Sequence, residues 1–452
     1  MSAYHLIGCG GAGMSVVAEL LLARGHEVTG SDQRPSATLE RLSRAGVTVW
    51  SGHDPQRVPP QATVVVSTAI RPTDPELARA RERGQEIIHR SQALALAARG
   101  LDFVAIAGTH GKTTTAGMAA AALNAAGEDP SFAVGSLVKG FESGAHIGKG
   151  KLFIAEADES DGSFLNYEPR IAVVTNIEPD HLDHYGSAEA VDEAFVDFAS
   201  LLGDGGTLIA CADDEGSARL ARRARAEGIE TVTYGHGVEA DARICSEVLA
   251  GDSSSIDIVY RSHSTQLVVP VPGAHNILNA TAAWLVGVTA GVERSTMARA
   301  LAAFRGTGRR FDTRGVVGGV RVVDDYAHHP TEVAALIEQA RQVASGQVRV
   351  VFQPHLFSRT KAFAAEFARA LAGADEAIVT DVFAAREDPD PQVTSRLITD
   401  AMEKGAYVAD MNEAGRLLAS HALKGDVLVT VGAGSITTVA DVIVAELERM
   451  YG

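Results

Sequence analysis

The chain has 452 residues, of which 46% are hydrophobic and 21% charged, and its formal net charge is −17. This is the composition of an ordinary soluble globular protein, and the length predicts about three domains of roughly 150 residues each. The negative field would repel nucleic acid and anionic membranes, which argues against general binding to either, but it allows a local basic pocket for phosphates.

The three cysteines, Cys9, Cys211 and Cys245, show no C-x-x-C spacing. They fit a reducing compartment and do not predict a metal site built from thiolates. The N-terminus has neither the basic region nor the apolar segment of an export signal, and no run of about 18 apolar residues predicts a membrane span. We expect a cytoplasmic protein without membrane insertion.

Short apolar runs alternate with longer segments of helical period along nearly the whole chain, a pattern typical of parallel α/β domains. The first domain is expected over residues 1–97, and the segment Ser91–Gly100 is its expected connection to the next domain. Its predicted strands are Tyr4–Ile7, Glu27–Thr29, Val47–Trp50 and Thr63–Val66.

A glycine loop, Gly8–Gly13, follows the first strand directly and satisfies G-x-G-x-x-G, with Asp32 further along the chain. Such a loop at the start of a helix cradles a diphosphate. A single match is weak evidence for NAD, so a dinucleotide-dependent oxidoreductase and a protein with another diphosphate ligand are both open at this point. The nucleotide motif in the next domain favours the second.

The second domain is expected over residues 98–310, and its sharpest motif is the sequence GTHGKTTT at Gly108–Thr115. The backbone N–H groups of such a turn and the helix dipole favour a polyphosphate. Lys112 would reach the terminal phosphates, and the Thr113 hydroxyl would take one position on Mg²⁺. Ile106 stands where the usual P-loop has glycine, so this is the compact form G-T-x-G-K-[ST]. The predicted strands of this domain are Phe103–Ala107, Leu152–Ala155, Ile171–Thr175 and Thr207–Ala210.

Two acidic motifs come next, each just after an apolar strand. Glu156 has the strand-end position at which open α/β sheets bind ligands, and a carboxylate there can hold Mg²⁺. In Asn176–His184, histidine beside carboxylates suits a second metal ion or a phosphate contact. Taken alone, Glu156 could equally be an ordinary loop carboxylate, and a capped helix start with solvated charges would be the better interpretation of Asn176–His184.

Two further changes of pattern precede the third domain. Between about Thr231 and Pro272 the period is near two, which predicts a small antiparallel excursion before a helix that starts near His275. The glycine-rich basic stretch Arg305–Arg310 predicts a hinge.

The third domain is expected over residues 311–452. Polar motifs follow two of its strands, at Asp324–Pro330 and Gln353–Thr360, and Arg359 is suited to grip a substrate carboxylate. The histidines of these motifs would more often be structural than catalytic if they occurred alone. A turn of small residues, Gly432–Ser435, offers a close backbone approach to a ligand. The predicted strands are Val320–Val323, Val348–Phe352, Ala377–Thr380 and Val427–Val431.

Over essentially its whole length the chain resembles the Mur ligase family, and within it the branch that adds L-alanine to UDP-N-acetylmuramate. The resemblance depends on eight ordered motifs. They are Gly10–Ser15, Gly30–Asp32, Gly108–Thr115, Glu156–Asp161, Asn176–His184, His275–Ala280, Asp324–Pro330 and Gln353–Thr360.

The resemblance implies three α/β domains: an N-terminal Rossmann-like domain for the UDP-sugar, a central P-loop-type domain with a mostly parallel sheet for ATP, and a C-terminal Rossmann-like domain for the amino acid. The implied UDP-sugar contacts are Gly10, Gly11, Ala12, Gly13, Met14, Ser15 and Asp32. The implied ATP contacts are Gly108, Thr109, His110, Gly111, Lys112, Thr113, Thr114, His275, Asn276, Arg310 and Asp325. Thr113 and Glu156 would hold one Mg²⁺ and His181 a second. The implied catalytic group is Lys112, His328, His355 and Arg359, with His355 and Arg359 around the alanine carboxylate.

One departure from the family is informative. Several relatives carry a carbamylated lysine shortly after the metal-binding histidine, whereas this chain has no lysine from residue 152 to residue 360. The alanine-adding branch is expected to lack that lysine, so its absence supports the branch and leaves open what completes the second metal shell.

The implied reaction belongs to peptidoglycan precursor synthesis. The muramate carboxylate attacks the γ-phosphate of ATP, and the amine of alanine then displaces phosphate from the acyl phosphate. His328, His329 or His355 could take the proton from the amine. The alternatives are a ligase that attaches a whole tripeptide to the same UDP-sugar, the dinucleotide-dependent oxidoreductase and a non-catalytic nucleotide-binding regulator.

Overall fold

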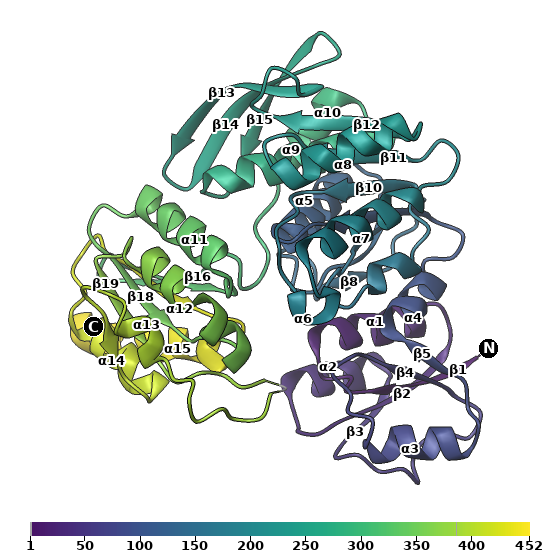
Figure 1. The fold of residues 1–452 in the computed structure, drawn as a ribbon, viewed down its shortest axis with the longest axis horizontal. Coiled ribbons are helices and arrows are strands. Elements are labelled where there is room, and N and C mark those ends of the chain that lie inside the picture. Colours follow the sequence, from purple (N-terminus) through teal and green to yellow (C-terminus); the bar gives the residue numbers. More distant parts are fainter. Residues whose placement is uncertain (1, 386) are drawn as a thin grey trace. The chain divides into compact units, whose positions relative to one another are not determined.

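The computed structural model describes residues 2–385 and 387–452 of the chain. The chain divides into two compact units (Figure 1). The first unit is Met1–Glu247, Ile256–Val268 and Leu278–Arg305, and the second is Val248–Ser255, Val269–Ile277 and Gly306–Gly452. The boundary passes through Arg305–Arg310, where the sequence predicts a hinge. None of the helices in the described residues is long and apolar enough to cross a membrane.

The N-terminal sheet is fully parallel, with the strand order β3-β2-β1-β4-β5. Its strands are β1 Ala3–Ile7, β2 Glu27–Asp32, β3 Thr48–Ser51, β4 Thr63–Val66 and β5 Ile87–His89. Its helices are α1 Ala12–Ala23, α2 Ala37–Ala45, α3 Pro75–Glu82 and α4 Arg90–Ala97. The order reverses beside β1, so the loop after β1 opens at the switch point where such sheets bind ligands.

The second sheet has ten strands in the order β15-β14-β13-β12-β11-β10-β6-β9-β7-β8. Its strands are β6 Asp102–Ala107, β7 Ser131–Ala133, β8 Ala145–His146, β9 Leu152–Glu156, β10 Ile171–Val174, β11 Thr207–Cys211, β12 Glu230–Gly235, β13 Ala242–Ala250, β14 Ser253–Tyr260 and β15 His263–Val269. Its helices are α5 Lys112–Ala125, η1 Ser163–Asn166, α6 Leu182–Tyr185, α7 Ala188–Ser200, α8 Glu215–Ala226, α9 Ala274–Thr289 and α10 Arg294–Leu301. Strand β6 lies between β10 and β9, parallel to both, so the ends of these three strands meet at one edge.

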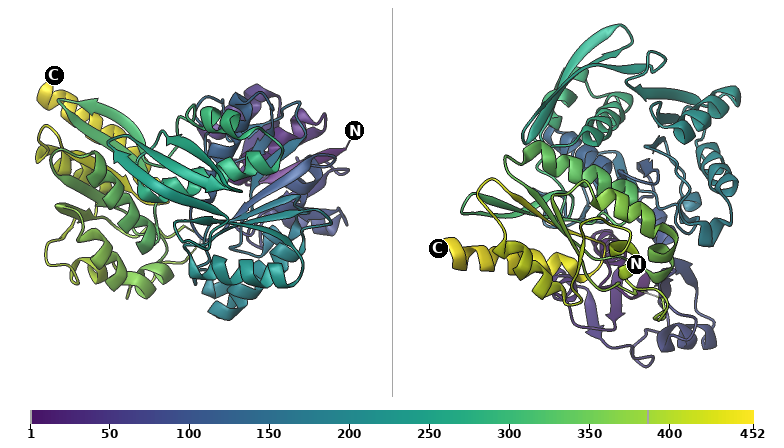
Figure 2. Two further views of the ribbon diagram at one scale, coloured as in Figure 1. Left: turned by 90° about the horizontal axis from the view of Figure 1, so that it is seen from above. Right: turned by 60° about the vertical axis from the view of Figure 1, so that its left-hand side comes forward.

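The predicted antiparallel excursion begins later than expected. Strand β12 pairs in parallel with both β11 and β13, so it still belongs to the parallel part of the sheet. Strands β13, β14 and β15 are joined by two-residue connections, which link antiparallel strands. They form the twisted ribbon visible in both views of Figure 2. Helix α9 then starts at Ala274, one residue before the predicted position.

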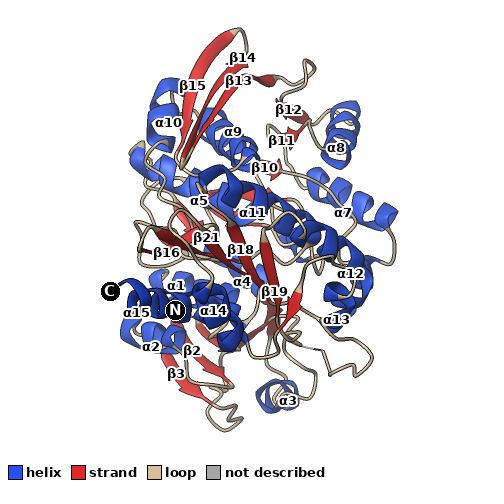
Figure 3. Cartoon of the chain, turned by 90° about the vertical axis from the view of Figure 1, so that its left-hand side faces the viewer, coloured by secondary structure: helices blue, strands red, loops and turns tan. Residues whose placement is uncertain are grey.

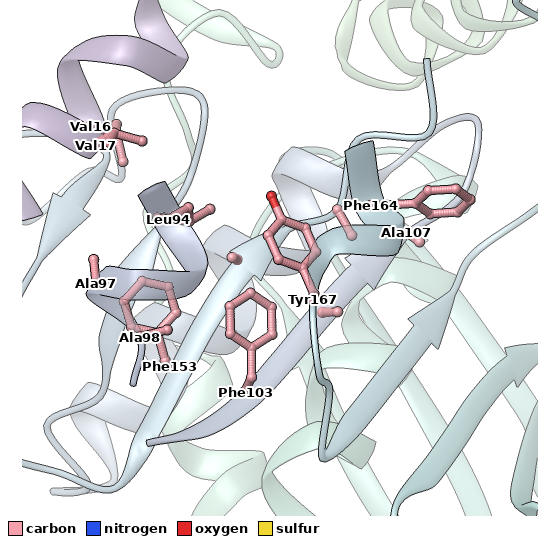
Figure 4. Close-up of a cluster of buried hydrophobic side chains, with 14 of the residues drawn as sticks. Val16, Val17, Leu94, Ala97, Ala98, Phe103, Ala107, Phe153, Phe164 and Tyr167 are labelled. Carbon is pink, nitrogen blue, oxygen red and sulfur yellow. The ribbon is translucent and has the colours of Figure 1, made fainter. Parts of the chain in front are cut away.

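The connection expected at Ser91–Gly100 is largely a packed helix. Ala93, Leu94 and Ala97 of α4 are buried, and they belong to one hydrophobic core that also contains residues of α1 and β6. Figure 4 shows Leu94, Ala97 and Ala98 together with Phe103, Phe153 and Tyr167. The Phe103 ring stacks on both aromatic neighbours, with centroids 5.5 Å and 4.9 Å apart. The first two sheets therefore share a core within one unit.

The third sheet has six strands in the order β16-β17-β21-β18-β19-β20 and is parallel except for the β16–β17 hairpin. Its strands are β16 Asp312–Val317, β17 Val320–Asp325, β18 Val348–Phe352, β19 Glu376–Val379, β20 Ala406–Tyr407 and β21 Val427–Val431. Its helices are α11 Pro330–Val343, α12 Phe357–Leu371, α13 Arg396–Thr399, α14 Met411–Ser420, η2 Ser435–Thr438 and α15 Val439–Tyr451. One core packs α11 and α12 on one face, and another packs α14 and α15 on the other (Figure 3). Three α/β sheet domains, mostly parallel, confirm the predicted fold class, whereas the exact domain boundaries stay predictions.

Candidate functional site

The first glycine loop lies between β1 and α1. The N–H groups of Gly8 and Cys9 both donate to the carbonyl of Ser31 on β2, at 2.8 and 2.9 Å, which holds the loop against the sheet. The N–H of Gly10 donates to Oδ2 of Asp32 at 2.9 Å. A Cβ on Gly10 would lie 2.8 Å from that oxygen, so only glycine allows this approach.

Helix α1 begins after Gly11 without a side-chain cap, so its first N–H groups are available to an anion. Met14 and Ser15 lie in the first turn of α1. The Met14 side chain is buried in the core, and the Ser15 hydroxyl donates to the carbonyl of Ala12. The N–H of Ser15 donates to the carbonyl of Gly11 at 2.9 Å, so this residue is engaged within the first turn of the helix.

The phosphate loop connects β6 to α5, and its two glycines have left-handed conformations. Gly108 has a φ of +123°, and a Cβ there would lie 2.2 Å from Oγ1 of Thr175. Gly111 has a φ of +86° and caps α5, where a Cβ would lie 2.6 Å from Oδ1 of Asn279. Both conformation and space therefore require glycine at these positions.

Asn176 fixes the same loop from the end of β10. Its Oδ1 accepts from the N–H of His110 at 2.8 Å, and its Nδ2 donates to the His110 carbonyl at 3.1 Å. Its own carbonyl accepts from the N–H of Thr109 at 3.1 Å. Because the N–H groups of Thr109 and His110 are engaged in this way, a phosphate at this loop would meet the N–H groups of the first turn of α5, which includes Lys112, Thr113 and Thr114.

The Lys112 ammonium lies over its own loop. Nζ donates to the carbonyls of Gly108 and Thr109 at 2.5 and 3.1 Å and to Oε1 of Glu159 at 2.8 Å. Burial by itself would lower the pKa of Lys112. The negative charges of Glu159, Asp158 and Glu156 outweigh this effect, so the pKa of Lys112 is raised. Burial raises the pKa of Glu159 to about 7 against the opposing effect of Lys112. The lysine therefore stays protonated at neutral pH, and Glu159 is the group of the pair that titrates.

Thr113 and Glu156 form the oxygen pair expected of a Mg²⁺ site. Oγ1 of Thr113 donates to Oε2 of Glu156 at 2.9 Å, and the other carboxylate oxygen accepts from the N–H of Gly135 at 2.6 Å. Hydroxyl and carboxylate oxygens are the ligands that Mg²⁺ prefers. The donor set at this point fits the ion, with Gly135 orienting the carboxylate.

His181 lies near the same cluster. Its Nε2 is 3.9 Å from Oε1 of Glu159 and 3.7 Å from Oδ2 of Asp180. The residue has a φ of +56°, a left-handed conformation that is uncommon for a side chain of this size. The first unit thus gathers Lys112, Glu159 and His181, whereas Glu156 lies with Thr113 beside them.

In the second unit, two of the residues implied for ATP, His275 and Asp325, lie close enough to Arg310 for its charge to shift their pKa values. Oδ2 of Asp325 accepts from the N–H of Phe311 at 2.6 Å, and Oδ1 accepts from the N–H of Ala327 at 2.8 Å. Burial raises the pKa of Asp325 to about 6, although Arg310 opposes the shift. Burial and Arg310 lower the pKa of His275 to about 4. Asn276, next to His275, is buried and donates through Nδ2 to the carbonyl of Pro272 at 2.7 Å.

Three of the residues implied for catalysis, His328, His355 and Arg359, also lie near one another in the second unit. The rings of His328 and His355 meet edge to face with centroids 6.0 Å apart, and His355 stacks on Phe383 at 5.8 Å. Nδ1 of His328 donates to the carbonyl of Tyr326 at 3.1 Å. Burial lowers the pKa of His328 to about 3, and the charge of Arg359 acts in the same direction.

Three contacts of the site could not be read from the sequence, although the residues lie in or beside motifs named there. Asn279 accepts from the Thr115 hydroxyl at 3.1 Å beside Gly111, and Glu159 pairs with Lys112. The small-residue turn at Gly432–Gly434 is tied down by Arg309, whose Nη2 donates to both glycine carbonyls at 2.6 and 3.3 Å. Asn279 belongs to the motif His275–Ala280, Glu159 to Glu156–Asp161 and Arg309 to the stretch Arg305–Arg310, but no local pattern gives their partners.

Comparisons with known proteins cover the whole chain. Three family models match it: the catalytic domain of the Mur ligase family at residues 3–101, the Mur ligase middle domain at 106–287 and the Mur ligase glutamate ligase domain at 309–434. A UDP-N-acetylmuramate–L-alanine ligase from Kineococcus radiotolerans is 53% identical over 96% of this chain and 94% of that protein. The protein of the same name from Renibacterium salmoninarum is 52% identical over 96% and 93%.

Solved structures agree with this. The crystal structure of a UDP-N-acetylmuramate-alanine ligase from Thermotoga maritima has a TM-score of 0.84 and 26% identity, with full coverage of both chains. A murein peptide ligase from Psychrobacter arcticus has the same fold, with a TM-score of 0.75, 24% identity and 99% coverage of both chains. The chain belongs to the Mur ligase family.

Proposed function

We propose that this chain is an ATP-dependent ligase that joins L-alanine to the carboxylate of UDP-N-acetylmuramate, releasing ADP and phosphate, in peptidoglycan precursor synthesis. The observation that carries the proposal is the phosphate loop at the switch point of the second sheet, with Lys112 and the Thr113–Glu156 oxygen pair. Relatives that are 44–53% identical carry the name of the alanine-adding ligase, which favours alanine over a tripeptide as the acceptor. An oxidoreductase would leave the phosphate loop unexplained.

Each substrate would use a different part of the chain. The UDP-sugar diphosphate would bind at Gly10–Gly13 and the open start of α1, and ATP phosphates would bind at the start of α5 with Lys112. His275, Asn276, Arg310 and Asp325 would contact the rest of the nucleotide. Mg²⁺, held by Thr113 and Glu156 with a second ion at His181, would neutralise phosphate charge.

The chemistry follows from this arrangement. A carboxylate oxygen of the muramate attacks the γ-phosphorus of ATP in line, ADP leaves, and an acyl phosphate results. Lys112 stabilises the charge on the transferring group, because a fixed cation in a water-poor site costs no reorganisation during the step. The alanine amine, after losing a proton, attacks the acyl carbon, and phosphate leaves as the amide forms.

Arg359 would hold the alanine carboxylate through its planar guanidinium. The proton acceptor would be one of His328, His329 and His355. The lowered pKa of His328 makes it a weak base, which counts against it.

A phosphate-release assay tests the proposal directly. UDP-N-acetylmuramate, Mg²⁺ and ATP are kept constant, and alanine, glycine, serine and an alanine-led tripeptide are compared as acceptors. Alanine should give the highest kcat/KM. A higher kcat/KM with the tripeptide would show that the tripeptide, and not alanine, is the acceptor. Phosphate release that does not depend on the UDP-sugar would contradict the proposed ligase activity.

A further inference from the structure

Arg90, the first residue of α4, lies against the first glycine loop. A Cβ on Gly13 would come 2.7 Å from Nη1 of Arg90, so the guanidinium occupies the space that a larger residue at this position would need. The conformation of Gly13 does not itself require glycine, because its φ is not positive. The third glycine of the motif therefore makes room for an arginine at the open N-terminus of α1.

The same guanidinium reaches the loop after β9. Its Nη2 donates to Oδ2 of Asp158 at 2.5 Å, and the other carboxylate oxygen accepts from the N–H of Ser160 at 3.1 Å. Asp158 lies between Glu156, which pairs with Thr113, and Glu159, which pairs with Lys112. One side chain thus touches both the glycine loop of the first sheet and the carboxylate loop of the second.

Neighbours of Arg90 reinforce this link. Nε2 of His89 is 3.6 Å from Oδ2 of Asp161, and Nδ2 of Asn166 donates to the Ser91 hydroxyl at 2.8 Å. The start of α4 is therefore fastened to the segment 158–166 at three successive residues. Arg90 differs from His89 and Ser91 because it carries a full charge. Its side chain is 27% exposed, so a ligand can still reach it.

The charges around Asp158 point the same way. Asp158 accepts from Arg90, and Lys112 lies close enough to act on it electrostatically, so this carboxylate has two cations near it. A guanidinium has five N–H donors in a fixed plane, and a single carboxylate oxygen uses only part of that capacity. An anion at the start of α1 would meet the remaining donors on the Nη1 side.

We propose that Arg90 is a positioning residue that couples the two substrate sites. Its Nη1 side binds a phosphate of the ligand at the first glycine loop, while Nη2 holds Asp158 and with it the loop that carries Glu156 and Glu159. The inference rests on the proposed function, because it takes the ligand of the glycine loop to be the diphosphate of the UDP-sugar.

The test separates the two halves of the coupling. Arg90→Ala removes both contacts and should raise the KM for UDP-N-acetylmuramate at least tenfold and the KM for ATP about threefold. Arg90→Lys keeps the charge, but one ammonium cannot replace the planar guanidinium with its several donors. This variant should therefore restore the KM for ATP and leave the KM for the UDP-sugar at least threefold above that of the unchanged protein. Asp158→Asn frees Arg90 for the ligand, so the KM for ATP should rise at least threefold while that for the UDP-sugar stays unchanged or falls.

A purely structural role predicts another outcome, in which all three variants lower the melting temperature and change kcat without separating the two KM values. That outcome, or a UDP-sugar KM within twofold of the unchanged protein in Arg90→Ala, would overturn the inference. Titration calorimetry with UDP-N-acetylmuramate alone gives the same comparison for Arg90→Ala without turnover. Arg219→Ala, which breaks an exposed ion pair with Asp192 (2.9 Å), is the matched control and should change nothing. If the unchanged protein neither binds nor converts the UDP-sugar, the proposed function fails first.

Discussion

Two buried glutamates, Glu76 in the N-terminal sheet domain and Glu159 beside the phosphate loop, have pKa values that move in opposite directions. Both side chains are almost inaccessible, with exposed fractions of 0% and 3%. Yet the pKa of Glu76 falls to about 2, and that of Glu159 rises to about 7. Burial raises the pKa of each, so the difference must come from the donors around the carboxylates.

Glu76 is surrounded by donors. It accepts from the Trp50 indole at 3.1 Å, from the N–H of Asp54 at 2.9 Å, from the Ser31 hydroxyl, and from His5 at 3.2 Å. Although His53 and Asp74 lie close enough to Glu76 to suggest a metal site, these hydrogen bonds already engage both oxygens of Glu76. We therefore interpret this hydrogen-bond network around Glu76, called the closed network below, as structural.

Glu159 has fewer partners. Lys112 is its main donor and is shared with two backbone carbonyls, while Oε2 of Glu159 has no hydrogen-bond partner within the described residues. A carboxylate with this little support is costly to keep charged in a buried place. The contrast teaches that a satisfied carboxylate stabilises the fold, whereas an under-satisfied one marks a place where a ligand rearranges the charges.

The largest expected effect comes from removing the Lys112 ammonium, which is the main donor to Glu159. Lys112→Ala should lower kcat/KM for ATP by at least about 10³-fold, because the transferring phosphoryl group loses its fixed positive charge. A phosphate-release assay with UDP-N-acetylmuramate and alanine measures the loss. Lys404→Ala, at an exposed position, is the control. Turnover retained in Lys112→Ala would contradict the assignment of the phosphate loop.

The next effect concerns the oxygen pair. Glu156→Gln keeps the shape but removes the charge, so it should lower kcat by about 10²-fold and shift the Mg²⁺ dependence to higher concentration. Turnover measured over a Mg²⁺ titration gives both values, and Glu168→Gln, at an exposed position, serves for comparison. An unchanged Mg²⁺ dependence would remove Glu156 from the metal site.

A smaller and more selective effect is expected in the second unit. Arg359→Ala should raise the KM for alanine about 10- to 100-fold with little change for ATP, because one charge-assisted pair with the carboxylate is lost. Arg369→Ala is a matched control on the same helix, since Arg369 is 70% exposed and pairs with Glu366 one turn away. Equal changes in both KM values would indicate a general disturbance of the domain.

Sequence patterns were sufficient for what is local. The strand before Gly108, the glycines of the loop and the threonines after Lys112 all form a pattern among neighbours in the chain. The predicted strands Tyr4–Ile7 and Phe103–Ala107 accordingly lie within β1 and β6. Short strands such as β5, β7, β8 and β20 were missed because two or three residues carry no readable period.

What the sequence could not supply is pairing across long separations. The order β10-β6-β9 places Asn176 and Glu159 on either side of Lys112, but no local pattern specifies that order. The same holds for Arg90, whose partners Gly13 and Asp158 are far away in the chain. Likewise, the segment Ser91–Gly100 looks like a connection by composition, and only its burial shows that it joins two sheets into one core.

The smallest effect on catalysis, and the sharpest test of the closed network, is expected from Glu76→Gln. The change should lower the free energy of unfolding by about 2 to 3 kcal/mol at pH 7, because one carboxylate with several donors is lost. Its effect on kcat should stay within about twofold. Hydrogen–deuterium exchange over β1 to β3 should rise, and Glu82→Gln, 65% exposed on the same helix, should leave it unchanged.

The pH dependence gives the sign of this contribution. The folded pKa of Glu76 is about 2 and its ordinary value is 4.5, so the stabilisation is fully present above pH 4.5 and is lost as the pH falls toward 2. The difference in unfolding free energy between the unchanged protein and Glu76→Gln should therefore be largest at pH 7 and shrink steadily below pH 4.5. A difference that is constant from pH 7 to pH 3 would mean that packing, and not the charge of Glu76, accounts for its role, and the contrast with Glu159 would then lose its physical basis.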